Sequence, residues 1–121
     1  MKVIYGPRCS GKTHELIRMA NKNDQYIIVP TEREASRIYH EAYRQNLAIR
    51  TPISVSECLY RSRQPVGGVL IDDVTAILAD LLHLDRIDAV TVCAREHLQL
   101  ETRLPPETVE LMRSMGQEVD E

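Results

Sequence analysis

The feature that most restricts the fold of this chain is an alternation of short apolar runs with longer amphipathic segments. Residues 3–5, 26–29 and 69–71 are such runs, and each is followed at once by glycine, proline or aspartate. Continuous apolar runs are typical of strands buried on both faces of a parallel sheet, and turn residues end such strands. Strands that alternate with helices form βαβ units. The sequence therefore predicts an α/β fold with a mainly parallel sheet of about five strands flanked by helices.

Two further strands are expected, at residues 53–55 and at residues 89–93, the second of which would be the last strand of the sheet. A short helix through Cys58 should follow the first of them. The clearest helix is predicted to begin after Thr31, the N-cap, with Glu34 in the capping-box position, and to run to about Gln45. Its apolar side chains recur at helical spacing and are expected to form one core stripe, made of Ala35, Ile38, Tyr39, Ala42 and Tyr43. At this spacing the two tyrosines are interpreted as core residues rather than as rings that stack on a base.

The same periodicity predicts two more amphipathic helices. One should run from about Lys12 to Asn21 and lay Leu16, Ile17 and Ala20 on one face. The other should follow the run at residues 69–71. Its predicted core stripe consists of Val74, Ile77, Leu78, Leu81 and Leu82.

Length, charge and cysteine content narrow the class of protein. At 121 residues, with 43% hydrophobic and 27% charged residues, the chain is expected to be a globular domain at residues 1–100 and an acidic tail at 101–121. The tail is predicted to hold a short helix at residues 107–115. No apolar run suits a membrane span and the first residues do not resemble a signal peptide, so we expect a cytoplasmic protein without a membrane partner. The three cysteines are odd in number and far apart, so their spacing suggests neither a disulfide framework nor a structural zinc site.

The segment from Gly6 to Thr13 carries the strongest chemical signal. It fits the pattern GxxxxGK[ST] and lies between a predicted strand and a predicted helix, which is the context that this pattern requires. In such a loop, backbone N–H groups and the N-terminus of the helix bind phosphate oxygens. Lys12 would neutralise the β and γ phosphates, and the hydroxyl of Thr13 would bind Mg²⁺. The residues expected to bind nucleotide are Gly6, Pro7, Arg8, Cys9, Ser10, Gly11, Lys12, Thr13 and His14.

Two carboxylates follow the apolar run at residues 69–71. Ligands of parallel sheets bind at the carboxyl ends of the strands, so Asp72 is the expected second metal ligand beside Thr13. The alternative is that one of these aspartates only caps the helix that begins at Val74.

These two segments resemble the Walker A and Walker B motifs of P-loop NTPases, and the resemblance covers about residues 2–94. The paired acids, and the extra strand expected before them, resemble the RecA-like branch, which includes helicases, terminase motors and AAA-type ATPases. The resemblance implies Mg²⁺-dependent binding and hydrolysis of ATP or GTP, with Lys12 and Asp73 as catalytic residues. In this branch the second acid orients the attacking water, so the resemblance implies that role for Asp73. The branch usually has glutamate where this chain has Asp73, which implies slow hydrolysis. A single core of this kind implies a minimal phage-type or nucleic-acid-associated ATPase.

Residues 27–35 are similar to a helicase segment in which a Pro-Thr turn touches nucleic acid. That similarity implies phosphate contacts from Thr31 and Arg33, and a γ-phosphate sensor at Thr91 or Cys93 on the last strand. The alternative for Thr31 is a capping role alone. The partners implied are a nucleoside triphosphate, a nucleic acid or protein, and a second copy of the chain.

Two other functions remain open. Residues 6–17 are similar to the loop of zinc-containing thymidine kinases, which implies phosphoryl transfer to a nucleoside or another small acceptor. The chain departs from that family because it has no cysteine quartet for zinc and neither phenylalanine nor tryptophan. The third function is a nucleotide-binding regulatory module that does not hydrolyse its ligand.

Overall fold

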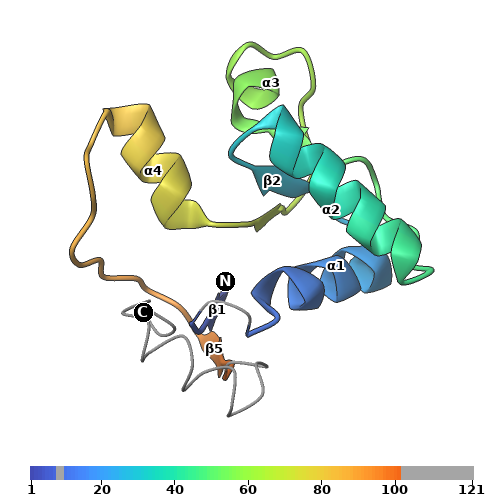
Figure 1. Ribbon diagram of the computed structural model, residues 1–121, viewed down its shortest axis with the longest axis horizontal. Coiled ribbons are helices and arrows are strands. Elements are labelled where there is room, and N and C mark those ends of the chain that lie inside the picture. Colours follow the sequence, from blue (N-terminus) through green and yellow to red (C-terminus); the bar gives the residue numbers. More distant parts are fainter. Residues whose placement is uncertain (8–9, 102–121) are drawn as a thin grey trace, which may run out of the picture. The chain divides into compact units, whose positions relative to one another are not determined.

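The protein has an α/β architecture in which helices alternate with short parallel strands (Figure 1). The computed structural model describes residues 1–7 and 10–101. The chain divides into two compact units, one made of Met1–Lys12 with the chain from Thr91 on, and the other of Thr13–Val90. In the described part of the chain, the sheet predicted as one of about five strands is instead a two-stranded and a three-stranded sheet.

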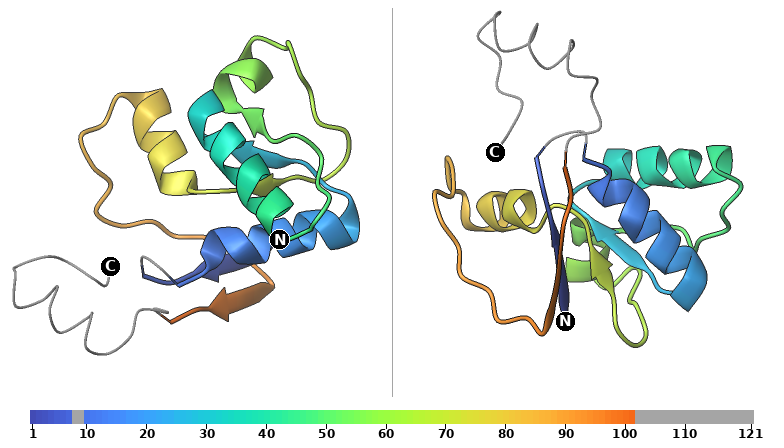
Figure 2. Two further views of the ribbon diagram at one scale, coloured as in Figure 1. Left: turned by 45° about the vertical axis from the view of Figure 1, so that its right-hand side comes forward. Right: turned by 90° about the horizontal axis from the view of Figure 1, so that it is seen from below.

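The first unit is built on two strands that are far apart in the sequence. β1 (Lys2–Tyr5) pairs in parallel with β5 (Glu96–Gln99), and the register aligns Lys2 with Glu96 and Tyr5 with Gln99. The N–H of Leu100 extends the ladder by donating to the carbonyl of Tyr5 at 2.8 Å. Both views of Figure 2 show the two strands side by side.

The predicted last strand at residues 89–93 is wrong. Those residues form no strand, and the strand lies at β5, a few residues further along. Val90 and Val92 are 54% and 60% exposed, so their apolar side chains do not contribute to a core. Parallel pairing is made by backbone hydrogen bonds, and β1 makes these with a segment that contains a single apolar residue, Leu98.

The second unit contains a three-stranded parallel sheet. β2 (Ile27–Val29) is the central strand, between β3 (Ile53–Ser54) and β4 (Leu70–Ile71). All three residues of β2 are buried, as expected for a continuous apolar run between two neighbours. The N–H of Asp72 donates to the carbonyl of Ile28 at 3.0 Å, which fixes Asp72 at the carboxyl end of β4.

Within residues 1–7 and 10–101, four helices accompany these strands: α1 (Lys12–Asn23), α2 (Glu32–Arg44), α3 (Val55–Leu59) and α4 (Val74–Leu82). The predicted inner face of the first helix is confirmed, because Leu16, Ile17 and Ala20 are buried. The helix predicted after Thr31 is confirmed as α2, which packs against β2 and β3.

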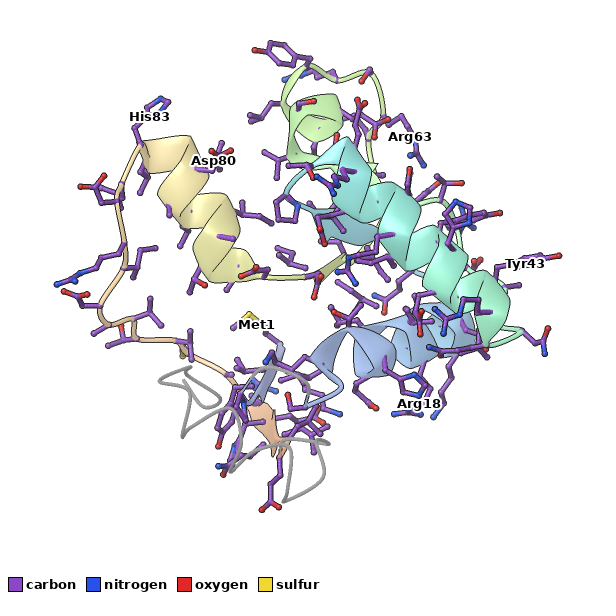
Figure 3. The ribbon with its side chains drawn as sticks, in the orientation of Figure 1. Met1, Arg18, Tyr43, Arg63, Asp80 and His83 are labelled. Carbon is purple, nitrogen blue, oxygen red and sulfur yellow. The ribbon has the colours of Figure 1, made fainter. Side chains whose placement is uncertain are left out.

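The core stripe of α2 is narrower than predicted. Ala35, Ile38 and Ala42 are buried, but Tyr39 is 44% exposed and Tyr43 is 78% exposed. Figure 3 shows the Tyr43 side chain projecting outward from the end of the helix. The two tyrosines follow Ile38 and Ala42 by one position each, so they lie about 100° further around the helix, at the edge of the packed face.

The predicted stripe of α4 is only partly buried. Ile77 is its one buried residue, whereas Val74, Leu78, Leu81 and Leu82 are 38% to 60% exposed. The strand that precedes α4 contributes two residues to the sheet, so within this unit there is little sheet surface for the helix to cover. Across the part of the chain that the structure describes, no helix is both long and apolar enough to cross a membrane.

Candidate functional site

Lys12, the first residue of α1, folds back onto the loop that precedes it. Its Nζ donates hydrogen bonds to the carbonyls of Gly6 and Pro7, the second at 2.7 Å, and lies 3.4 Å from the Oγ of Ser10. The positive charge is therefore held against the backbone carbonyls of Gly6 and Pro7. Arg8 and Cys9, which were also expected to bind nucleotide, lie outside the described residues.

The loop passes close to the end of β5, and this contact requires a glycine. A Cβ added to Gly6 would lie 2.6 Å from the carbonyl oxygen of Leu100 and 2.9 Å from the Oγ of Ser10. Ser10 is itself buried, with 2% of its surface exposed. Gly11 has a φ of +90°, in the left-handed region that glycine adopts readily. Both glycines of the pattern thus have a steric reason to be glycine.

In the second unit, the structure brings together the two side chains that the sequence nominated as metal ligands. Thr13 lies in the first turn of α1, and Asp72 directly follows β4, 59 residues later. The Thr13 hydroxyl donates to Asp72 Oδ1 at 3.4 Å. A hydroxyl and a carboxylate at this separation offer oxygen ligands of the kind that Mg²⁺ prefers.

The surroundings of Asp72 disfavour an unpaired negative charge. Burial raises the pKa of its carboxyl above the ordinary value of 3.8, and the adjacent charge of Asp73 raises it further. The charge of Arg37 and the hydrogen bond from Thr13 act in the opposite direction. A bound cation would relieve the same penalty. Among the described residues, no cluster of three or more His, Cys, Asp and Glu side chains could hold a metal ion.

Asp73 is the N-cap of α4. Its Oδ1 accepts hydrogen bonds from the N–H of Ala76 at 3.3 Å and from the hydroxyl of Thr75 at 3.4 Å. The residue has a φ of +60°, in the left-handed region that aspartate tolerates better than most residues. Asp73 therefore caps α4, and its action on water stays a prediction.

The residues expected to touch nucleic acid lie at the start of α2. Thr31 caps that helix, because its Oγ1 accepts from the N–H of Glu34 at 3.2 Å, so its capping role is confirmed. Arg33 is exposed and forms no ion pair with any other described residue. His14 is half-buried in α1.

The expected γ-phosphate sensors do not lie on a strand. Thr91 and Cys93 are exposed and precede β5. The polar residue at the carboxyl end of β5 is Gln99, which is paired with Tyr5. This residue escaped prediction because the strand itself was placed too early in the sequence.

Arg37 is a charged neighbour of Asp72 that the sequence did not assign to the site. It donates two hydrogen bonds to Glu34 Oε2, at 2.9 and 2.7 Å, and its charge lowers the pKa of the Asp72 carboxyl. The spacing of Glu34 and Arg37 on one helix face predicts their ion pair, but nearness to Asp72 depends on how α2 and β4 pack.

Comparisons with models of protein families, with curated proteins and with solved structures found no match to this chain. What the chain does is therefore inferred from the chemistry of its own residues. Two local arrangements contribute: the hydrogen bonds of the Lys12 ammonium to the carbonyls of Gly6 and Pro7, and the pairing of Thr13 with Asp72.

Proposed function

We propose that this chain is a P-loop NTPase of the RecA-like branch, which binds ATP or GTP with Mg²⁺ and hydrolyses it slowly. The observation that carries the proposal is the hydrogen bond between Thr13 and Asp72. A loop pattern alone predicts phosphate binding by local chemistry. The contact of Thr13 with Asp72, which is 59 residues away, supports the metal-binding part of such a site.

Each group in the proposed site has a distinct task. The loop amides and Lys12 would hold the phosphates, and Thr13, the next residue in the chain, would join Asp72 in holding Mg²⁺. When bound, Mg²⁺ would neutralise phosphate charge. Asp73 would orient a water molecule toward the γ-phosphorus. Attack by that water breaks the bond to the bridging oxygen and releases inorganic phosphate and the diphosphate.

One observation favours a second candidate function, a nucleotide-binding module with negligible turnover. Asp73 Oδ1 is already the acceptor for the first turn of α4. To orient a water molecule, this carboxylate would have to give up its hydrogen bond to the helix. Binding without hydrolysis is the expected behaviour if the cap persists when nucleotide is bound.

Nucleotide binding is the first test of the proposed function. Thermal unfolding would be followed with and without Mg·ATP at about one hundred times its Kd, where binding adds about 2.7 kcal/mol to the free energy of unfolding. Lys12→Ala should lose this gain. Lys22→Ala is the matched control, because Lys22 is an exposed lysine in the last turn of the same helix. An equal gain for Lys12→Ala and the wild type would contradict the assignment of the loop.

Turnover separates the remaining functions. Phosphate release from ATP would be measured alone, with single-stranded DNA and with double-stranded DNA, for the wild type and for Asp73→Asn. Release that DNA stimulates and that Arg33→Ala weakens would support a nucleic-acid-associated ATPase. Formation of ADP only when a nucleoside acceptor is added would support a kinase. Tight binding without release in any condition would support the regulatory module.

A further inference from the structure

The unit that contains the loop also has a cavity on one face of its sheet. The cavity has a volume of about 440 Å³ and is lined by Val3, Tyr5, Val92, Ala94 and His97. This volume lies within the range of about 300 to 1,000 Å³ that is typical of small-molecule sites. The groove along α2 that includes Tyr39 and His40 is smaller, at about 270 Å³. The cavity on the β1–β5 sheet is thus the better candidate for a bound ligand.

The β1–β5 register explains why aromatic rings gather in this cavity. Val3 is paired with His97, and side chains alternate along a strand, so Val3, Tyr5 and His97 lie on one face of the sheet. The Tyr5 and His97 rings are diagonal neighbours, with centroids 6.3 Å apart and planes inclined by 35°. Both side chains are exposed, and Tyr5 is 42% exposed. Two aromatic faces are therefore open to a ligand.

The lining selects a flat, uncharged aromatic ligand. Its other walls are the aliphatic side chains of Val3, Val92 and Ala94, and none of the described residues that line it carries a carboxylate or an ammonium group. Aromatic side chains bind bases by stacking, because every base presents a π face. A phosphate or a metal ion would find too few polar partners here.

The position of Tyr5 connects this cavity to the loop. Tyr5 is the last residue of β1, and Gly6, the first residue of the loop, follows it directly. We propose that Tyr5 and His97 bind the base of the nucleotide whose phosphates the loop holds. This inference rests on the proposed function, and it assigns a base-binding role to a strand that the phosphate chemistry does not use. Because stacking discriminates little between purines, ATP and GTP should bind with similar affinity.

Comparison of ATP with tripolyphosphate, which has the phosphates but no base, tests the inference. Titrations of Mg·ATP and Mg·tripolyphosphate would be made with the wild type, Tyr5→Leu and His97→Leu. Leucine keeps an apolar side chain of similar reach on the strand but removes the aromatic face. We expect the wild type to prefer ATP by about 5- to 100-fold, and each variant to lose most of that preference while its tripolyphosphate affinity stays unchanged. Tyr60→Leu is the control, because Tyr60 is a tyrosine that is 84% exposed in the other unit.

The possible failures are distinguishable. If both leucine variants keep the wild-type ratio of ATP to tripolyphosphate affinity, the base does not bind at Tyr5 and His97, and the proposed function stands. If the wild type binds neither compound, the proposed function fails, and the inference fails with it. If Tyr5→Leu loses tripolyphosphate as well, the substitution has disturbed the adjoining loop. His97→Leu, on the other strand, then decides between the outcomes.

Discussion

At the scale of single residues, Asp72 occupies a position that makes its ionisation unfavourable in the folded chain. Its pKa is raised by burial and by Asp73, so the folded chain binds a proton there more tightly than the unfolded chain, where the value is near 3.8. Above the raised pKa, the ionised carboxyl lowers the free energy of unfolding. At pH values well below 3.8 the carboxyl is protonated in both the folded and the unfolded chain. Asp72 then no longer lowers the free energy of unfolding. Asp72 therefore reduces stability at neutral pH.

Asp72→Asn should consequently raise the melting temperature at neutral pH, because the carboxamide carries no charge to bury. The gain should shrink as the pH falls toward about 4, where the wild-type carboxyl also becomes neutral. Melting curves followed by circular dichroism at both pH values measure this. The same variant should lose Mg²⁺-dependent nucleotide binding. Asp80→Asn, a change at an exposed position of α4, should alter neither property. A lower melting temperature for Asp72→Asn at neutral pH would contradict the stated cause.

Gly6→Ala should destabilise the first unit. The new methyl group would lie 2.6 Å from the Leu100 carbonyl, so either the loop or the end of β5 must move. We expect the free energy of unfolding in urea to fall by about 1–3 kcal/mol, together with a loss of nucleotide affinity. Gly68→Ala is the matched control, because its methyl group would meet only the flexible side chain of Gln25, at 3.2 Å. Equal losses in the two variants would show that the contact with Leu100 is not responsible.

The sequence predicts a site residue well when the residues that it contacts lie near it along the chain or follow a general rule of parallel sheets. Lys12 and its loop follow from a contiguous pattern, and the meeting of Thr13 with Asp72 follows from the rule that ligands gather at the carboxyl ends of parallel strands. The approach of Arg37 to Asp72 and the ring pair of Tyr5 with His97 could not be predicted. Each of these contacts depends on how two elements pack against each other, and no pattern within either element predicts that packing.

At the scale of elements, α2 illustrates how a helix boundary is specified. The Oγ1 of Thr31 accepts a hydrogen bond from the N–H of Glu34, as the predicted N-cap role of Thr31 requires. Thr31→Ala should lower the free energy of unfolding by about 1 kcal/mol. Thr31→Ser should keep most of the stabilisation that the cap provides, because serine also supplies a hydroxyl oxygen. Urea denaturation measures both. If the serine variant were as unstable as the alanine variant, a contact of the threonine methyl group would be responsible instead of the cap.

The helices were predicted better than the strands, for a physical reason. A helix buries a stripe whose period is visible in the sequence, and the buried residues of α1 and α2 follow that period. β3 and β4 are two residues long, and β5 is mostly polar, so their pairing depends on distant backbone partners rather than on their own composition. Residues 89–93 have the composition of a strand, but they pair with no other described strand.

At the scale of the whole molecule, the first unit depends on a ladder between segments more than 90 residues apart. Truncation after Arg95 would remove β5 and leave β1 without its ladder partner. We expect the shortened chain to lose the thermal stabilisation by Mg·ATP. Truncation after Glu101 leaves the β1–β5 ladder intact and should preserve the thermal stabilisation by Mg·ATP. Retention of the full stabilisation by the shorter of the two chains would show that β1 positions the loop without β5.

The same pairing has a consequence for the order of events on the ribosome. β1 leaves the exit tunnel more than 90 residues before β5, and at about 5–20 residues per second this interval lasts roughly 5 to 20 seconds. During that interval the hydrogen-bonding edge of β1 has no native partner, whereas the three strands of the other unit have all been translated by Ile71. β1 thus waits longer for its native partner than the strands of the other unit do, and an unpaired strand edge of this kind is prone to wrong pairing with other chains.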